Sequence, residues 1–394
     1  MKPPKEKSKI VRITLMVLFA SATMASAQTY CWTNFASGAD FAGAYGATVD
    51  SDGTIYTASL GSGKLARITS AGVVTILGAS VPAPIEIVVS TNTHNLYVSS
   101  LSAGVVKVVP PYGAGNTSQI DGSYQSFACA VDSATETVYA SDTGNQQIRI
   151  IPNGGAGSVL AGSGAAGSTD STLLGSSFNR PCGIAVVVSG GNTNLYVADR
   201  DNNKIRKIDL GGNAVTTLAG GGAACPGDGT GGAAGFLTPT GCTLGPDGNL
   251  VIADQDNLTV RKVALPGAVV TTLGGNCSFG YDNANGCGTA GHFSDIGQCG
   301  VASDGTIYVA DRANGDIKKG TAPPVVNELD VQIDFTAGAS DTASQFTLYA
   351  SSTIVPASSY APVSATITQL GPGSFRVVRQ AAGSVQFYRI KSSN

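Results

Sequence analysis

The 394-residue sequence contains only two histidines, three methionines and one tryptophan, and charged residues make up 12% of it. It has no Cys-x-x-Cys pair, and two histidines (His94 and His292) are too few for the common zinc sites. Outside the N-terminus, no apolar run approaches the roughly eighteen residues that a membrane-spanning helix needs. Nucleophile-elbow, phosphate-loop and dinucleotide-binding signatures are also missing. The sequence therefore carries no familiar catalytic motif.

The first 27 residues have the features of a secretory signal. Five basic residues accompany a short apolar stretch at 13–20, and Ala25-Ser26-Ala27 is a small-residue cleavage site. Cleavage after Ala27 lowers the basic residues from 23 to 18 and the acidic ones from 26 to 25, which leaves a net charge near −7. We expect a protein exported to the periplasm, the cell surface or the medium, without a membrane span. Its acidity disfavours nucleic acid as a partner.

Glycine is abundant, with 52 residues, and one recurring unit accounts for most of the chain. The stretch 195–208, LYVADRDNNKIRKI, has five relatives, which begin IYTAS, LYVSS, VYASD, LVIAD and IYVAD. The successive spacings are 41, 42, 57, 55 and 57 residues when the copies are aligned on Tyr56, Tyr97, Tyr139, Tyr196, Val251 and Tyr308. A period of roughly 40–50 residues is typical of propellers and other repeat arrays.

Each unit contains four strand signals. An inner apolar strand such as 183–188 precedes a hairpin turn and the signature strand. A strand of alternating basic and apolar residues follows, for example 204–208, and then a threonine-rich outer strand such as 215–219. Several hairpin turns carry Asp-Gly, the usual tight-turn pair. Four antiparallel strands in each of six units predict an all-β fold, a six-bladed β-propeller over residues 28–320.

The pattern of the unit resembles a known family. It consists of Pro-x-Gly with apolar residues, LYVAD-x-x-N-x-x-IRK, VTTLAG, and a glycine-rich link to the next Phe-Asn-x-Pro-x-Gly. This pattern resembles the NHL repeat, closely over roughly residues 128–320 and more weakly in the first two units. The resemblance implies a six-bladed propeller, in agreement with the strand count, and a role as an interaction platform.

The ends of the propeller region are expected to meet. The sixth unit ends at Gly320, and Pro323-Pro324 bars a fourth strand. Residues 29–36 resemble the missing outer strand, so we expect them to complete the last blade and seal the ring. Residues 321–327 are an expected linker.

Residues 328–394 are expected to form a small C-terminal β domain. Alternating runs at 345–349, 365–370, 374–378 and 385–390 favour a β-sandwich or β-roll. The ending QFYRIK is similar to C-terminal modules of secreted bacterial repeat proteins, which implies attachment or surface retention. Packing against the propeller is the alternative.

Two kinds of loop share one face of the expected propeller. Because each hairpin reverses the chain, the turn after a signature strand lies on the same face as the link to the next blade. Three links are long, at 153–179, 221–238 and 275–297, and we expect a ligand on their face. On this face four blades present candidate ligand contacts: Asp142 and Asn145, Asp199 and Asn202, Asp254 and Asn257, and Asp311 and Asn314. Turn capping by Asp and Asn is the alternative explanation.

Arginines recur at one place in the third strand, at Arg149, Arg206 and Arg261. They are expected to pair with carboxylates of a neighbouring blade or to line a solvated blade edge.

All eight cysteines follow the signal, as in an exported protein with disulfides. Cys129, Cys182 and Cys299 are expected at matching inner-strand positions, with Cys242 one place later. The candidates for disulfide bonds are Cys225, Cys242, Cys277, Cys287 and Cys299. The bridges considered are Cys225 with Cys242, and Cys277 with Cys287 or Cys299; buried free thiols are the alternative.

Two classes of function remain. The favoured one is a non-enzymatic binding or scaffold propeller that engages a protein or carbohydrate ligand through its loop-rich face. The other is a metal-dependent propeller hydrolase, lactonase or lyase. A calcium-dependent hydrolase would need a glutamate in the channel, and only Glu86, on an inner-strand signal, could point there. We therefore expect no cofactor, with calcium as the alternative; the sequence does not specify the oligomeric state.

Overall fold

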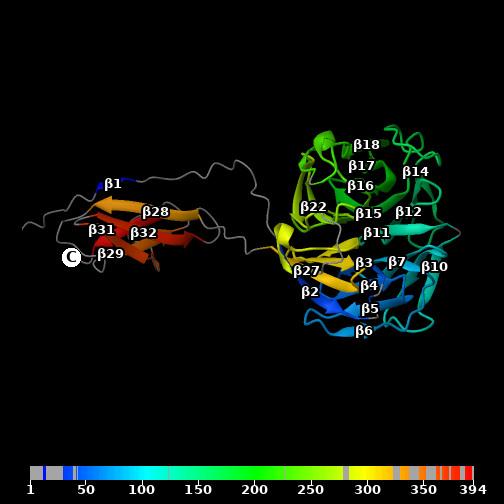
Figure 1. The fold of residues 1–394 in the computed structure, drawn as a ribbon, viewed down its shortest axis with the longest axis horizontal. Helices are drawn as coiled ribbons and strands as arrows, with labels where there is room; N and C mark the ends of the chain where they lie inside the picture. Colours follow the sequence, from blue (N-terminus) through cyan, green and yellow to red (C-terminus); the bar gives the residue numbers. More distant parts are fainter. Residues whose placement is uncertain are drawn as a thin grey trace, which may run out of the picture. The chain divides into compact units, whose positions relative to one another are not determined.

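The computed structural model describes residues 12–14, 30–38, 41, 43–122, 124–225, 227–277 and 284–322, and the strands of a C-terminal region. It divides into two compact units, Ala27–Pro323 and Met1–Ser26 with Pro324–Asn394. Apart from residues 12–14, the expected signal lies outside the described residues, as do residues 323–327 of the expected linker. The larger unit is the propeller (Figure 1).

Six antiparallel sheets form the six blades, each with its first strand innermost. Blade 1 consists of β3 (Ala44–Val49), β4 (Ile55–Ser59), β5 (Lys64–Ile68) and β6 (Val74–Ile76). Blade 2 consists of β7 (Pro84–Val89), β8 (Leu96–Ser100), β9 (Gly104–Val108) and β10 (Thr117–Asp121). Blade 3 consists of β11 (Ser126–Asp132), β12 (Thr137–Asp142), β13 (Gln147–Ile151) and β14 (Ser158–Ala161). Blade 4 consists of β15 (Pro181–Ser189), β16 (Asn192–Asp199), β17 (Lys204–Asp209) and β18 (Ala214–Ala219).

Blades 5 and 6 each have an additional short strand on the outer edge. From the axis outward, blade 5 consists of β20 (Pro239–Leu244), β21 (Leu250–Asp254), β22 (Thr259–Ala264), β23 (Val269–Gly274) and β19 (Gly229–Thr230). In the same order, blade 6 consists of β25 (Ile296–Val301), β26 (Ile307–Asp311), β27 (Asp316–Thr321), β2 (Cys31–Ser37) and β24 (Gly286–Cys287). Short 3-10 turns occur at η2 (Arg200–Asn202), η3 (Gly231–Ala233) and η4 (Gly288–Ala290).

The inner strands form a closed ring. Each of β3, β7, β11, β15, β20 and β25 contacts the next, and β25 contacts β3. The approach is so close that a Cβ added at Gly183 would lie 2.5 Å from the backbone nitrogen of Cys242, so only glycine fits there. The prediction of an all-β, six-bladed propeller is confirmed.

The signature strands are buried on both faces because each blade packs between two others. All five residues of β4, β8, β21 and β26 are buried, as is the LYVAD part of β16. Their near-continuous apolar runs follow from this two-sided burial. The core is accordingly divided into clusters between blades, such as the one that joins Ile148 of blade 3 to Leu195 of blade 4.

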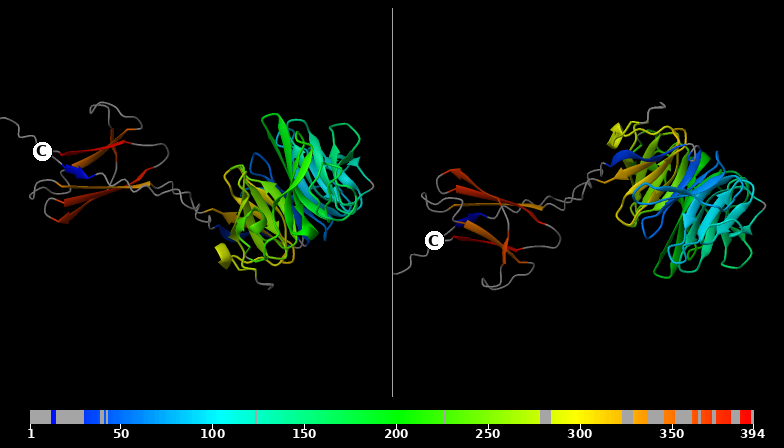
Figure 2. Two further views of the ribbon diagram at one scale, coloured as in Figure 1. Left: turned by 90° about the horizontal axis from the view of Figure 1, so that it is seen from above. Right: turned by 90° about the horizontal axis from the view of Figure 1, so that it is seen from below.

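The last blade contains both ends of the propeller. The N-terminal strand β2 pairs antiparallel with β27, with Trp32 opposite Gly320. Figures 1 and 2 show the blue β2 beside the yellow-orange β27. Trp32 is fully buried and packs edge-on against Phe293, with ring centres 5.0 Å apart. A Cβ at Gly320 would lie 2.4 Å from the Trp32 ring, so this glycine makes room for the indole.

The second unit contains two small antiparallel sheets. One has the order β1 (Arg12–Thr14), β28 (Leu329–Thr336), β32 (Ser374–Ala381) and β31 (Thr366–Gly371). The other has the order β30 (Ala361–Val363), β29 (Phe346–Ser351) and β33 (Phe387–Ser392). Strands β29, β31, β32 and β33 overlap the four alternating runs of the sequence. No helix within the described residues is long and apolar enough to span a membrane.

Candidate functional site

The strand order defines two faces of the propeller. The turns after the second strands and the links between blades lie on one face, which we name the link face. The turns after the first and third strands lie on the opposite face, which we name the hairpin face. The predicted ligand contacts are all on the link face.

The four Asp-x-x-Asn pairs have their carboxylates turned inward. Asp142, Asp199, Asp254 and Asp311 are at most 1% exposed. Each accepts a hydrogen bond from the asparagine of its own turn, at 2.8–3.0 Å. Three of them also accept a backbone N–H of the incoming link, as Asp254 does from Leu237 at 2.8 Å. The turn and the link thus occupy the carboxylates, in agreement with the turn-capping alternative, and ligand contact by these pairs stays a prediction.

Burial raises the pKa of each of these four carboxyl groups, and raises that of Asp254 to about 6. Hydrogen bonds from Asn257, the Leu237 N–H and Arg261 act in the opposite direction at Asp254. The carboxylates are thus structural groups whose charge is compensated inside the blade.

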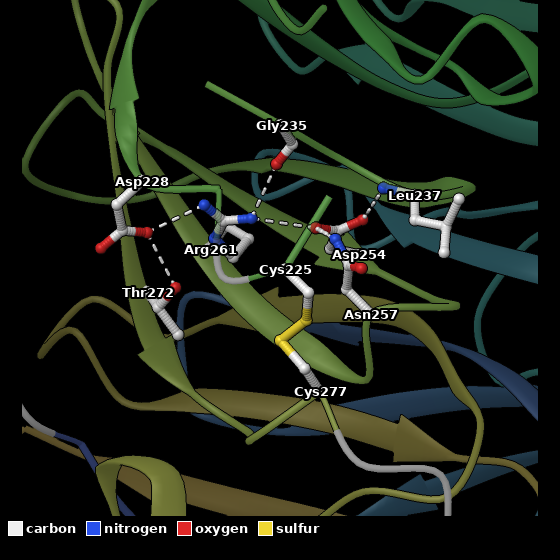
Figure 3. Close-up of a disulfide and its surroundings, with 9 residues drawn as sticks. All are labelled: Cys225, Asp228, Gly235, Leu237, Asp254, Asn257, Arg261, Thr272 and Cys277. Carbon is white, nitrogen blue, oxygen red and sulfur yellow. Dashed lines mark hydrogen bonds and ion pairs between the residues drawn. A yellow bond between two sulfur atoms is a disulfide. The ribbon is translucent and has the colours of Figure 1, made fainter. Parts of the chain in front are cut away.

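The arginines of the third strands fasten the links. Arg261 is fully buried, and its guanidinium donates to Asp254, to the Gly235 carbonyl and to Asp228 at 2.9–3.0 Å (Figure 3). Arg206 pairs in the same way with Asp199 at 2.9 Å and with Asp170 at 2.7 Å. Arg206 and Arg261 thus bind an aspartate of their own blade and one of the link that enters it, so the expected pairing with a neighbouring blade is wrong for these two.

The blade 3 arginine has a simpler arrangement. Arg149 pairs with Asp121, the last residue of β10 in blade 2, at 2.7 Å. Its ion pair therefore joins two adjacent blades without a long link. This is the pairing with a neighbouring blade that the sequence predicted for this position.

Two disulfide bonds hold the long links, but not the ones expected. Cys31 is bonded to Cys287, and Cys225 to Cys277. Cys242 and Cys299 are free, so the proposed bridges to them are wrong. Both lie within inner strands and are buried in the core, whereas Cys225 and Cys277 lie in successive links, beside the Arg261 network (Figure 3).

The long links return to the rim of the propeller. Ser171 forms a bridge with Val215 on the outer strand of blade 4, with hydrogen bonds of 2.7 and 3.1 Å. In blade 5, Thr230 pairs with Val269, and in blade 6 Cys287 pairs with Cys31. These links cover the outer edge strands of blades 4 to 6, where an open edge would invite pairing with another chain. Their length thus has a structural explanation.

A different group of side chains gathers on the link face, near the axis. Tyr45, Phe127, Gln255, Asp295 and Arg312 form it, and we name it the axial cluster. The Arg312 guanidinium lies 4.2 Å from the Tyr45 ring centre, and the Tyr45 and Phe127 rings meet edge to face at 5.4 Å. Asp295 accepts hydrogen bonds at 2.6 Å from both Arg312 Nε and Gln255 Nε2. Side chains of blades 1, 3, 5 and 6 thus form one connected arrangement.

The axial cluster is partly open to solvent and has uncommitted polar capacity. The side chains of Arg312 and Asp295 are 27% and 22% exposed. Burial raises the pKa of Asp295 and lowers that of Arg312. The Gln255 amide oxygen is buried and has no hydrogen-bond partner in the described part of the chain. A charged pair, an aromatic pair and a free acceptor are the groups that recognise polar ligands.

Sequence reasoning missed the axial cluster, although the repeat carried a signal for it. Gln255 and Arg312 follow the turn aspartate directly, at a position that holds Leu60, Leu101 and Thr143 in the first three blades. Four of the six copies share the aspartate, whereas the next residue differs among most copies. Variation at one position of a regular repeat is therefore the signal that could have indicated these residues.

Glu86 and the inner-strand cysteines are buried near the axis. Glu86 is 3% exposed, and its carboxyl accepts a hydrogen bond from the Gln298 side chain. In register, Cys129, Cys242 and Cys299 face Ala140, Ile252 and Val309, so these three match, and Cys182 lies two places earlier. The expected matching of Cys182 with Cys129 and Cys299 was therefore wrong. Burial raises the pKa of all four thiols, which makes them unreactive.

The two histidines lie apart. His94 is on the hairpin face, where its Nδ1 is 2.7 Å from Asp50 Oδ2. His292 is in a link, with its Nε2 2.7 Å from Asn276 Nδ2. Within the described ranges, no group of three or more His, Cys, Asp or Glu side chains is arranged to hold a metal ion.

Comparison with known proteins finds relatives of part of the chain. No family model matches the chain. It is 37% identical to NHL repeat-containing protein 2 of Homo sapiens over 90 residues, which are 23% of this chain and 12% of that protein. It is 26% identical to SUPPRESSOR OF QUENCHING 1 of Arabidopsis thaliana over 186 residues, 44% of this chain and 17% of that protein. The chain thus spans less than a fifth of the length of these relatives.

Solved structures show the same fold. A protein of unknown function from Bacteroides thetaiotaomicron aligns with a TM-score of 0.58 at 16% identity, over 74% of this chain and 76% of that one. An auxiliary nutrient binding protein from Bacteroides ovatus aligns with a TM-score of 0.54 at 15% identity, with the same coverage. Blades, repeats and relatives together define a six-bladed β-propeller. The recurring unit is similar to the NHL repeat over the matched residues, and this similarity together with the six blades fits an NHL-repeat propeller.

Proposed function

We propose that this protein is an exported, non-enzymatic binding propeller that engages a protein or carbohydrate ligand at the axial cluster. The single observation that carries the proposal is the convergence of Arg312, Asp295, Gln255 and the Tyr45–Phe127 pair from four blades. Polar side chains beside an aromatic face suit a ligand with hydroxyl or amide groups. Tyr45 and Phe127 lie on inner strands, and Gln255, Arg312 and Asp295 lie directly beside strand ends, so little ordering is needed before binding.

Four further observations support export and binding. The N-terminal sequence has the features of a cleavable signal, and the two disulfide bonds fit an oxidising compartment. One structural neighbour is named an auxiliary nutrient binding protein, although a likeness at 15% identity concerns the fold alone. The small C-terminal domain, by its resemblance to modules of secreted repeat proteins, would retain the propeller at the cell surface.

The test is a glycan and peptide array screen with the mature chain from residue 28, followed by calorimetry on the hits. Arg312→Ala removes the positive charge of the axial cluster, and Tyr45→Leu removes one aromatic ring while keeping an apolar side chain. Arg67→Ala, an exposed arginine on the third strand of blade 1, is the matched control. We expect each axial variant to weaken binding at least tenfold and the control to bind like the parent. Unchanged affinity in both axial variants would refute the site.

A further inference from the structure

A cavity on the hairpin face lies between blades 2 and 3, away from the axial cluster. Its volume is about 230 Å³, and its walls come from Tyr97, Lys107 and Ile120 of blade 2 and from Glu136, Ile151 and residues 152–155 of blade 3, which include the polar Asn153. Water occupies about 30 Å³ per molecule, so the cavity offers roughly the volume of eight waters. We propose that this cavity binds a small carboxylic acid with a short apolar chain.

Glu136 forms one end of the cavity and is fully engaged by the protein. It lies in the turn between β11 and β12, and its φ is +57°, a left-handed backbone conformation that residues other than glycine rarely adopt. It is 8% exposed and accepts hydrogen bonds from four side chains of blade 2: Ser90, Thr93, Asn95 and Tyr97. Four donors occupy the acceptor positions of a carboxylate, so Glu136 is not available to a ligand.

The charge of Glu136 is retained. Burial alone would raise the pKa of this carboxyl, but the four hydrogen bonds outweigh burial and lower it. The anion therefore persists at neutral pH and attracts a cation. That cation is Lys107, whose Nζ lies 3.9 Å from Glu136 Oε2.

Lys107 supplies the one cationic donor group among the residues that line the cavity. Its side chain is 22% exposed, and its ammonium lies 5.5 Å from the centre of the Tyr97 ring. At 3.9 Å from Glu136 it is beyond hydrogen-bond distance, and the structure gives it no hydrogen-bond acceptor among the described residues. An ammonium has three N–H donors, so it can bind both oxygens of an incoming carboxylate.

The remaining walls define the rest of the ligand. Ile120, Ile151 and Pro152 are apolar and face the same space as the ammonium. An acid whose chain has about five carbons places its charge on Lys107 and its chain against these residues. Of the corresponding lysines, Lys262 is bound by Asp247 at 2.6 Å, whereas Lys107 and Lys207 each lie 3.9 Å from a carboxylate. Among these three lysines, only Lys107 lines the cavity.

The proposal is independent of the axial cluster and is tested by calorimetry on the mature chain at low salt. Hexanoate and hexanamide are the two probes, since they share one shape and differ in charge. We expect hexanoate to bind and hexanamide to bind at least tenfold more weakly. Lys107→Gln should reduce hexanoate binding at least tenfold. Lys207→Gln, which changes the equivalent lysine of blade 4, should leave it unchanged.

A second variant fills the cavity and leaves the Lys107 ammonium unchanged. Ile120→Trp extends a half-buried residue of β10 into the space, and should abolish hexanoate binding while the thermal unfolding temperature stays near that of the parent. Three results overturn the proposal: no hexanoate binding at 10 mM, equal binding of acid and amide, or full binding by a folded Lys107→Gln variant. Loss of array ligands in the axial variants with hexanoate binding intact would show that the two sites are separate.

Discussion

Glu86 and Gln298 meet across the ring of inner strands, although 212 positions separate them in the chain. Glu86 belongs to blade 2 and Gln298 to blade 6, and the intervening strand of blade 1 has Gly46 at the corresponding position. A Cβ at Gly46 would lie 2.7 Å from the Glu86 Cα, so glycine is needed for the inner strands to approach this closely. The contact therefore depends on three blades and ties the start of the ring to its end.

Replacing Glu86 with glutamine is expected to stabilise the propeller at neutral pH. Burial raises the pKa of Glu86 well above its usual value near 4.5, so the folded protein holds a proton that the unfolded chain releases. The protonated Glu86 contributes its full stabilisation below the unfolded-state pKa, and this contribution is lost as pH rises through the folded-state pKa. We expect Glu86→Gln to exceed the parent by roughly 1–3 kcal/mol at pH 8 and to match it at pH 4, in urea unfolding.

The second buried glutamate of the propeller gives a control of opposite sign. Four hydrogen bonds outweigh burial and lower the pKa of Glu136, so its contribution is present above the unfolded-state pKa and is lost as pH falls. Glu136→Gln should therefore destabilise the protein at pH 7. If both variants shift stability in the same direction at neutral pH, one of the two assignments of charge is wrong.

Loss of Arg261 is expected to cost far more than loss of its outer partner. Arg261 and Asp254 are both fully buried, so Arg261→Met leaves an uncompensated carboxylate, at a cost of about 3–5 kcal/mol. Asp228 is 45% exposed, so Asp228→Asn should cost about 1 kcal/mol. Urea unfolding of both variants and of Asp254→Asn/Arg261→Met checks this, and the double variant should recover part of the loss. Equal costs for Arg261→Met and Asp228→Asn would contradict the network.

The two disulfide bonds should differ in their effect on stability. Cys31–Cys287 closes 256 residues and fastens β2 to the last blade, whereas Cys225–Cys277 closes 52 and joins two links. Removal of a native disulfide typically costs about 2–5 kcal/mol, more for longer loops in the chain-entropy model. Calorimetry should show a lower melting temperature for Cys31→Ser/Cys287→Ser than for Cys225→Ser/Cys277→Ser. Deletion of residues 28–37 should lower it at least as much as the first pair of substitutions.

The repeat made the fold predictable from sequence because it fixes local structure six times over. An LYVAD strand is buried on both faces wherever it occurs, and the turn and basic strand after it recur with the same register. Arg206 and Arg261 recur seven residues after Asp199 and Asp254, which they bind, so the repeat carried this pairing although we expected a partner on a neighbouring blade. Because the copies share one pattern, the strand pairing inferred for one blade applies to the others.

Features that join different copies could not be derived in this way. The disulfide partners depend on where two links of unlike sequence run, and Cys225 reaches Cys277 only because successive links lie side by side (Figure 3). The axial cluster likewise combines Tyr45 of blade 1, Phe127 of blade 3 and Arg312 of blade 6. Periodicity places each residue within its blade, whereas contacts across the ring depend on side-chain length and on closure.

The His94–Asp50 pair should be visible in solution as a raised histidine pKa. His94 Nδ1 lies 2.7 Å from Asp50 Oδ2, and this hydrogen bond, together with the carboxylate charge, raises the pKa of His94 above 6.5. The pair thus stabilises the fold fully below pH 6.5, and this stabilisation is lost as pH rises through the folded-state pKa. A proton NMR titration of the two histidine rings should show His94 losing its proton at higher pH than in Asp50→Asn. A His94 titration that does not move in Asp50→Asn would show that the pair is not formed in solution.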